Sequence, residues 1–276
     1  MLSKRIIACL DVRDGSVVKG VNFEGLRTAG DPATLARRYN QEGIDEVVIL
    51  DITATTEGRR ALRQTINAVA QEIFIPLTVG GGIQSMDAGS AAIDAGADKV
   101  SLNTAALENP SLITTLATRY GSQAVVVAID AKRVHARTYD EPRLDVHKNS
   151  LAASRNVTNA NLFSVYARSG QKLMNREAVE WAREAAERGA GEILLTSIDR
   201  DGTREGFDCE LTAAVSDAVN IPVIASGGAG GFDHFFEVFM SGRADAALAA
   251  SIFHFSEHAV RDLKIYLNDR DIPVRI

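Results

Sequence analysis

The chain has 276 residues, of which 46% are hydrophobic and 24% charged, a composition typical of a globular protein with a large core rather than a disordered or coiled-coil chain. Its formal net charge of −6 argues against a nucleic-acid partner, because phosphate-backbone binding depends on clustered Lys and Arg. Cys9 and Cys209 have no disulfide-rich or metal-ligand spacing, and the apolar start of the chain is too short for a signal sequence or membrane span. We therefore expect a cytoplasmic protein.

Short apolar runs of strand length alternate with segments of helical spacing along the chain. The runs of the first half are "IIACLD", "GIDEVVILDIT", "IPLTVGGG" and "ADKVSLNTA", and those of the second half are "VVVAID", "GAGEILLTSID", "IPVIASGG" and "ADAALAASI". The helical segments include "DPATLARRYNQEG" and "NREAVEWAREAAERG". Gly43 and Gly189 are the last residues of these two segments. Each stands just after its expected helix, where a left-handed C-cap is favoured.

The second half of the chain repeats the first. Asp11 corresponds to Asp130 at an offset of 119 residues. The later correspondences have offsets of 146, 146 and 147 residues, and they join Gly43 with Gly189, Gly81 with Gly227, and Asp98 with Asp245. The jump in offset places 27 extra residues between Asp130 and Gly189.

Eight alternations of strand and helix in about 250 residues are typical of a (β/α)8 TIM barrel. We predict one barrel over residues 1–276, built from two repeated half-barrels at about 1–121 and 122–276. An open doubly wound sheet is the alternative, but no switch point or edge strand is marked. The extra residues give an inserted loop at about 135–175, polar and interrupted by Pro142, whose end "LFSVYARSG" we interpret as the return strand of a hairpin over the active site.

Polar side chains end many of the predicted strands, and the carboxyl ends of strands carry the active site in this fold. They are Asp11, Asp51, Asn103, Asp130, Thr196 and Ser226. Asp11 and Asp130 are repeat-equivalent and lie on strands that face each other across an eight-stranded barrel. Such a pair can serve as general acid and general base, although a single Asp would as often cap a turn or pair with Lys. The sequence leaves open which carboxylate is the acid, and we add Thr196 and Ser226 to the substrate-binding residues.

Glycine-rich stretches follow the third and seventh predicted strands. "VGGGIQ" and "ASGGAG" permit close backbone approach, and their amides favour a phosphate oxygen. A tight turn is the alternative for each, but both are followed about twenty residues later by a second polar strand end, "LNTAA" and "AASIF". Two such pairs predict a long substrate with a phosphate at each end. We interpret "DRDGT" at 199–203 as a loop that adds the amides of Gly202, rather than as part of a calcium site.

Histidines offer one further candidate. His254 and His258 have the spacing of a metal-binding pair, but no third ligand stands out in the sequence. We therefore predict no metal and no cofactor.

The quoted motifs resemble, nearly word for word, those of a family of enzymes. "RIIACLDVRDGSVVKGVNF", "TVGGGI", "DKVSLNTAA", "AVVVAIDAKR", "GAGEILLTSIDRDGT", "IASGGAG" and "AALAASIFHF" resemble the cyclase subunits of imidazole glycerol phosphate synthase, over residues 1–134 and 176–276. The resemblance implies that ammonia attacks a doubly phosphorylated ribulosyl-aminoimidazole carboxamide nucleotide, giving imidazole glycerol phosphate and an aminoimidazole carboxamide ribotide. The alternatives are the related isomerase of the same pathway and a non-catalytic phosphate-binding platform for a partner.

The resemblance also implies roles for individual residues. Asp11 and Asp130 match the acid/base pair, and Lys19 matches the mobile loop after the first strand. One phosphate site is matched by Gly82, Asn103 and Thr104, and the other by Gly202, Gly228, Ala250 and Ser251. A glutaminase partner is expected on the opposite face of the barrel, with a passage for ammonia through its centre.

Charged residues are predicted at the floor of the barrel, where such a passage would begin. Side chains alternate along a strand, so Arg5 shares a face with Asp11, Lys99 with Asn103, and Glu192 with Thr196, while Glu46 begins the second strand. Two buried cations and two buried anions must pair with one another. On physical grounds this ring is equally a gate or a static plug, and the resemblance favours an ammonia gate.

Overall fold

The computed structural model describes residues 2–21, 24–52, 56–134, 162–254 and 259–276. Eight parallel strands close into a barrel, which confirms the predicted fold, because each strand pairs with both neighbours and the last strand pairs with the first. In order around the barrel the strands are β1 (Arg5–Arg13), β4 (Glu46–Asp51), β5 (Leu77–Gly80), β6 (Lys99–Leu102), β7 (Val125–Val134), β10 (Glu192–Ser197), β11 (Val223–Ser226) and β12 (Ala246–Ala249).

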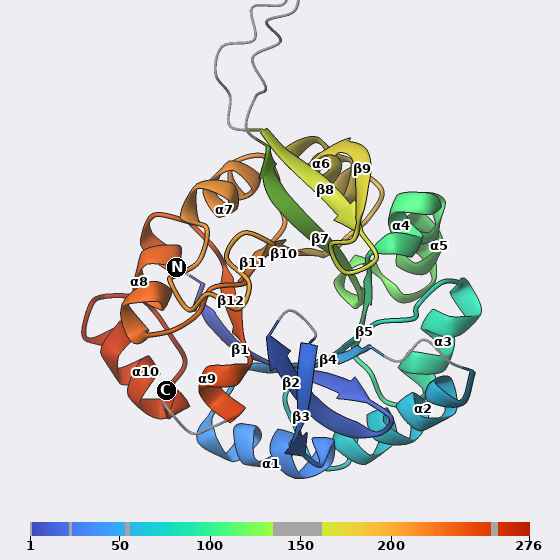
Figure 1. Ribbon diagram of the computed structural model, residues 1–276, viewed down its shortest axis with the longest axis horizontal. Helices are drawn as coiled ribbons and strands as arrows, with labels where there is room; N and C mark the ends of the chain where they lie inside the picture. Colours follow the sequence, from blue (N-terminus) through green and yellow to red (C-terminus); the bar gives the residue numbers. More distant parts are fainter. Residues whose placement is uncertain (1, 22–23, 53–55, 135–161, 255–258) are drawn as a thin grey trace, which may run out of the picture.

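Helices form a ring outside the strands (Figure 1). They are α1 (Pro32–Glu42), α2 (Thr56–Ala70), α3 (Met86–Asp94), α4 (Thr104–Glu108), α5 (Ser111–Tyr120), the 3-10 turn η1 (Ser122–Ala124), α6 (Ala178–Glu187), α7 (Cys209–Ser216), α8 (Phe232–Met240), α9 (Ser251–His254) and α10 (Val260–Asn268). Helix α1 shows why these segments start and stop as they do. Asp31 caps its first turn by accepting from Thr34 N, and Gly43 ends it in the left-handed conformation (φ 86°). Gly189, past α6, is also left-handed (φ 105°), so both predicted caps are confirmed.

Two apolar layers result from the alternation of side chains along the strands. The larger layer fills the space between strands and helices and includes the buried face of α6, formed by Ala178, Trp181, Ala182 and Ala185. The smaller layer lies inside the barrel and consists of Ile7, Cys9, Val48, Val126, Leu194, Ile224, Ala246 and Leu248. It separates the floor of the barrel from its mouth.

Each half of the barrel carries one antiparallel hairpin. These hairpins are additional to the eight alternating strands and helices of the predicted fold. In the first half β2 (Ser16–Val21) and β3 (Glu24–Gly30) extend from β1, and in the second half β8 (Leu162–Ala167) and β9 (Lys172–Glu177) extend from β7. The two hairpins lie on opposite sides of the ring (Figure 1). Strand β8 confirms that "LFSVYARSG" contains a return strand.

The hairpins also locate the extra residues of the second half more closely. Strand β3 ends at Gly30 and β9 at Glu177, an offset of 147 residues, which matches the last of the repeat pairs. The hairpin therefore belongs to both halves, and the extra residues lie between β7 and β8, in segment 135–161. Segment 135–161 lies outside the described residues, whereas the rest of the predicted loop, 162–175, forms β8 and the first part of β9.

Two strands change partners part-way along one edge. Strand β7 pairs with β6 through Val127 and with β8 from Asp130 onward, while β10 occupies its other edge. Strand β1 pairs with β12 through Ala8 and with β2 from Val12 onward, while β4 occupies its other edge. We call these two places the forks. At each fork the hairpin continues the sheet above the end of the preceding strand, so the long strands extend past Asp11 and Asp130 instead of ending there.

Three aspartates at the floor stabilise the starts of neighbouring strands. Each immediately precedes a strand, and its carboxylate accepts from the backbone N–H of a residue near the start of the adjacent strand. Asp45 accepts from Ile6 N at 2.8 Å, Asp98 from Leu77 N at 2.8 Å, and Asp245 from Val223 N at 3.1 Å. The repeat pair of Asp98 and Asp245 therefore reflects a shared strand-start contact. Among the described residues no helix is long and apolar enough to cross a membrane.

Candidate active site

The four charged residues predicted for the floor come together in one network. Arg5 Nη1 donates to Glu46 Oε2 at 3.0 Å and to Glu192 Oε1 at 2.8 Å. Lys99 Nζ donates to Glu46 Oε2 at 3.0 Å and to Glu192 Oε2 at 3.1 Å. Each cation thus contacts both anions, and the ring closes on itself. We call these four residues the floor ring.

A fifth member of this network was not predicted. The hydroxyl of Thr78, on β5, donates to Glu46 Oε1 at 2.6 Å, and Thr78 is 1% exposed. The same alternation that selects Arg5 and Lys99 also selects Thr78, two residues before the end of β5. Thr78 is uncharged, so a pattern of charged side chains does not include it.

Asp130 lies at the mouth, at the fork of β7. Its carboxylate Oδ2 accepts from Asn103 Nδ2 at 3.0 Å, so the residue that follows β6 is bonded across to β7. Burial is the largest influence on this carboxyl, and it raises the pKa of Asp130 to about 6. The Asn103 hydrogen bond opposes that shift and nearby Asp201 adds to it. Asp130 therefore titrates near neutral pH, as a proton-transfer group requires.

Asp11 lies at the equivalent fork of β1. Cys9, two residues earlier on the same inward face, has its sulfur 3.8 Å from Asp11 Oδ1. Strands β1 and β7 are separated by three strands in either direction around the barrel. The two carboxylates therefore stand on opposite walls of the mouth, as the repeat predicts.

Thr196 and Ser226 lie level with Asp130 in the sheet. Asp130 is in register with Thr196 on β10, and Thr196 is in register with Ser226 on β11. In a parallel sheet residues in register project to the same side. The wall of the mouth from β7 to β11 thus presents a carboxylate and two hydroxyls at one height. Asp51, the remaining polar strand end, is the last residue of β4.

The first glycine loop follows β5. Gly81 and Gly82 are both left-handed, with φ of 84° and 67°. A Cβ at Gly81 would lie 2.1 Å from the carbonyl oxygen of Asp51, whereas a Cβ at Gly82 would meet nothing within 4 Å. Gly81 is required for packing, and Gly82 faces open space where a ligand can approach the backbone.

The second glycine loop follows β11 and is packed against another loop. Gly228 is left-handed (φ 100°), and a Cβ there would lie 2.1 Å from the carbonyl oxygen of Gly206. Gly206 N also donates to Gly228 O at 2.8 Å. Gly202, in contrast, is left-handed (φ 76°) with open space around its Cβ position. In the second half of the barrel the glycine with open space is therefore Gly202, which comes before the packed Gly206–Gly228 contact in the chain.

The other predicted ligand-binding residues lie at or near strand ends. Asn103 and Thr104 follow β6 directly, and Ala250 and Ser251 follow β12 directly, so the two pairs occupy equivalent places in the repeat. Lys19 lies in β2, in register with Arg27 of β3. Thr104 also accepts a hydrogen bond from the tip of the β8–β9 hairpin, where Arg168 N donates to Thr104 Oγ1 at 3.0 Å. No pattern in the sequence indicates this last contact, because it joins residues 64 positions apart.

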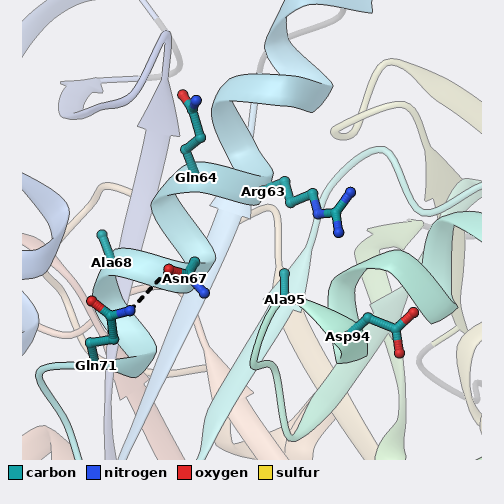
Figure 2. A pocket seen from close by; sticks show the side chains of 7 residues that line it. All are labelled: Arg63, Gln64, Asn67, Ala68, Gln71, Asp94 and Ala95. Carbon is teal, nitrogen blue, oxygen red and sulfur yellow. Dashed lines mark hydrogen bonds between the residues drawn. The ribbon is translucent and has the colours of Figure 1, made fainter.

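A surface depression of about 410 Å³ lies away from the mouth, between α2 and α3. Figure 2 shows its lining, which includes Arg63, Asn67 and Asp94, with Gln71 bonded to Asn67. These side chains belong to the outer helices. None of the predicted site residues lines this depression.

Metal-binding clusters of three or more His, Cys, Asp and Glu side chains are absent among the described residues. The candidate pair of His254 and His258 lies largely outside the described residues. His258 lies outside the described residues, and His254 ends α9 without a described side chain.

Known proteins identify the family of this chain. A family model described as "Histidine biosynthesis protein" matches residues 5–259. Proteins named "Imidazole glycerol phosphate synthase subunit HisF" match the whole chain. The chain belongs to the HisF family.

The relatives of the HisF family cover the full length without large gaps. The protein of Acidobacterium capsulatum is 56% identical over 276 residues, covering 100% of this chain and 99% of the relative. That of Bacillus licheniformis is 53% identical over 275 residues, covering 100% of both. That of Chlorobium phaeovibrioides is 52% identical over 276 residues, again covering 100% of both. The HisF family thus confirms the resemblance seen in the motifs and disfavours the isomerase alternative.

Proposed function

We propose that this chain is the cyclase subunit of imidazole glycerol phosphate synthase. In this reaction ammonia attacks a doubly phosphorylated ribulosyl-aminoimidazole carboxamide nucleotide, and the products are imidazole glycerol phosphate and an aminoimidazole carboxamide ribotide. The observation that carries the proposal is the pair of carboxylates at the forks, with Asp130 buried and its pKa raised to about 6. A binding platform for anionic phosphates would gain nothing from two carboxylates in its mouth.

Asp11 and Asp130 carry out proton transfer in this proposal. Ring closure requires a proton to leave the attacking amine and another to reach the departing group. The two carboxylates approach the reacting atoms from opposite walls, so one can accept and the other can donate. Asn103 holds the Asp130 carboxylate through its amide N–H, which fixes its direction.

The two glycine loops hold the two phosphates in this proposal. Gly82, Asn103 and Thr104 belong to the first site, and Gly202, Gly228, Ala250 and Ser251 to the second. The open backbone at Gly82 and Gly202 supports these assignments. A substrate anchored at both ends would lie across the mouth between the carboxylates, next to Thr196 and Ser226. Lys19, on the first hairpin, belongs to the substrate-binding residues in this proposal.

Turnover with ammonium salt and no partner tests the proposed function. We expect the purified chain to convert the doubly phosphorylated ribulosyl nucleotide at a rate that rises with ammonia concentration. The matched control is the ribosyl isomer of this nucleotide, which the isomerase alternative would convert without ammonia. Conversion of the isomer, or a rate independent of ammonia, would contradict the cyclase proposal.

The floor ring supports a second proposal, that a glutaminase subunit docks at the floor and delivers ammonia through the barrel. The ring closes the entrance, and above it the inner apolar layer leads to the mouth. If the ring is a gate, Lys99→Ala should preserve turnover with ammonium salt and change the fraction of glutamine-derived ammonia that reaches product. A proportional change with both ammonia sources would indicate a structural plug.

A further inference from the structure

The first of the two proposed phosphate sites has an electrostatic deficit. Gly82, Asn103 and Thr104 are all neutral, and Asp130 is bonded to Asn103. A phosphate group carries between one and two negative charges near neutral pH. Placing it beside a carboxylate requires a compensating cation, because burying unpaired charge is costly. If the proposed function is correct, a cation from another segment of the chain would add to the backbone amides that bind this phosphate.

The tip of the β8–β9 hairpin is the segment that reaches this site. Arg168 N donates to Thr104 Oγ1 at 3.0 Å, which fixes the backbone of the tip beside the start of α4. On its other side the Cβ position of Gly170 lies 3.4 Å from Ile198 Cδ1, just past β10. The tip is therefore held between the two neighbours of β7. This position follows from the fork, since β8 continues the sheet above the end of β6.

Arg168 brings a cation to that place. It is exposed and left-handed (φ 55°), and within the described part of the chain its guanidinium has no ion pair or hydrogen bond. Other arginines of this region are engaged. Arg133 pairs with Glu210 at 2.8 Å, and Arg176 pairs with Glu184. Arg168 is thus available for a ligand.

Asn103 provides an independent sign that this site binds a ligand. Its amide nitrogen is bonded to Asp130, but its Oδ1 is buried and has no hydrogen-bond partner among the described residues. A buried acceptor without a donor is unfavourable. A substrate hydroxyl or N–H next to the phosphate would satisfy it.

We propose that Arg168 binds the substrate phosphate held at Gly82, Asn103 and Thr104. Its planar guanidinium can give two parallel hydrogen bonds to phosphate oxygens. The hairpin of the second half thereby completes the phosphate site of the first half. The backbone N–H of Arg168 stays on Thr104, so the side chain is free to change without loss of the anchor.

Substitution of the side chain tests this proposal. Arg168→Gln keeps a long polar side chain and the backbone anchor but removes the charge. We expect KM for the doubly phosphorylated nucleotide to rise about 10-fold to 100-fold, the effect of losing a charge-assisted hydrogen bond, with kcat changed less than about 2-fold. Arg168→Lys should recover part of the loss. Inhibition by inorganic phosphate should weaken in parallel with substrate binding.

Two exposed lysines serve as matched controls. Lys172, at the other end of the same turn, is in register with Ala167, and Lys172→Gln should leave KM unchanged. Lys132 lies on β7 two residues past Asp130, and Lys132→Gln tests whether β7 supplies the cation instead. A wild-type KM in Arg168→Gln, or an equal rise in Lys172→Gln, would overturn the proposal. Thermal unfolding of each variant should match wild type.

Direct binding separates this proposal from the proposed function. Phosphorus NMR titration with inorganic phosphate requires no turnover. If the wild-type chain binds phosphate and Arg168→Gln binds it more weakly, Arg168 is a phosphate ligand even if the nucleotide is not converted. If both bind phosphate equally while the wild type converts the nucleotide, the function holds and the role of Arg168 is wrong. Absence of phosphate binding in the wild type would also reject it.

Discussion

The floor and the mouth of the barrel both bury carboxylates, but they give them different partners. At the floor Glu46 and Glu192 each contact both cations, and Glu46 is 1% exposed. At the mouth the hydrogen bond to Asp130 comes from a neutral amide, and burial raises its pKa to about 6. Glu46 and Glu192 are thus paired with opposite charges, whereas burial beside a neutral partner raises the pKa of Asp130.

Under the proposed function, this difference assigns the chemistry to the mouth of the barrel. At the floor each carboxylate is held between two cations and contributes to structure. A carboxylate that titrates near neutral pH can exchange a proton during a reaction. The two ends are separated by the inner apolar layer, so each keeps its own electrostatic environment. The following predictions test this contrast, and they are arranged from the largest expected effect to the smallest.

Substitution at the mouth should remove activity. Asp130→Asn and Asp11→Asn each keep the shape of the side chain and remove its proton transfer, so turnover with ammonium salt should fall about 10²-fold to 10⁴-fold. Circular dichroism and substrate binding should remain close to wild type. Near wild-type rates in both variants would remove the pair from the mechanism.

Substitution at the floor should instead remove stability. Glu46→Gln leaves Arg5 and Lys99 sharing the single charge of Glu192, and we expect the free energy of unfolding to fall by about 3 kcal/mol. We take the lower end of the range for breaking a buried ion pair, because the Arg5 side chain is 25% exposed. The control is Thr78→Val, which removes only the hydroxyl contact with Glu46 and should be unfavourable by about 1 kcal/mol. Denaturant unfolding measures both, and an equal loss in the two variants would show that the ring charges contribute little.

The stability of Asp130→Asn should depend on pH in a defined direction. The pKa of Asp130 rises from 3.8 to about 6 on folding, so its protonated form favours the fold. This contribution is fully present below pH 4 and is lost as the pH rises through about 6. The neutral asparagine avoids that loss, and the variant should be more stable than wild type at pH 8 by about 2–3 kcal/mol. The two proteins should converge near pH 4.

That convergence is measured by denaturant unfolding at both pH values. Glu46→Gln provides the contrasting case, since it should stay less stable than wild type at pH 8. If Asp130→Asn were also less stable at pH 8, the carboxylate would be stabilised by a charge and the contrast between floor and mouth would be wrong.

The glycine loops at the mouth should show a smaller effect that differs between the halves. Gly82→Ala places a Cβ in open space at a positive φ, so it should reduce stability by roughly 1–2 kcal/mol and raise KM several-fold. Gly228→Ala places its Cβ 2.1 Å from the carbonyl oxygen of Gly206 and should destabilise the fold more. Thermal unfolding and KM of both variants test the difference. Equal unfolding temperatures would indicate that the second loop can shift without strain.

Much of this architecture is predictable from the sequence, because it depends on repetition and alternation. The repeat predicts the barrel and the opposed positions of Asp11 and Asp130, and strand parity predicts that Arg5, Lys99 and Glu192 share an inward face. These are local rules that hold along each strand. Consecutive glycines indicate where the backbone can be approached closely, but they do not distinguish the open Gly82 from the packed Gly81 and Gly228.

The contacts between neighbouring strand ends are not predictable in the same way. The hydrogen bond from Asn103 to Asp130 and that from Arg168 to Thr104 join residues far apart in the chain. They depend on how β6, β7 and β8 meet at the fork. No periodic pattern in the sequence indicates this arrangement. The first hairpin was also missed, because "SVVKGV" and "EGLRTAG" are short and their antiparallel pairing adds strands outside the eightfold alternation.

The forks have a mechanical consequence for this enzyme. Asp130 lies where β7 exchanges β6 for β8, and β10 holds the opposite edge of β7 on both sides of that point. Bending of the β8–β9 hairpin at this fork would therefore not move the Asp130 carboxylate. The same holds for Asp11. It is paired with β4, and the pairing of β1 with β2 begins one residue later, at Val12. Bending of either hairpin at its fork would therefore leave Asp11 and Asp130 in place, because both residues remain paired with a neighbouring strand of the barrel wall.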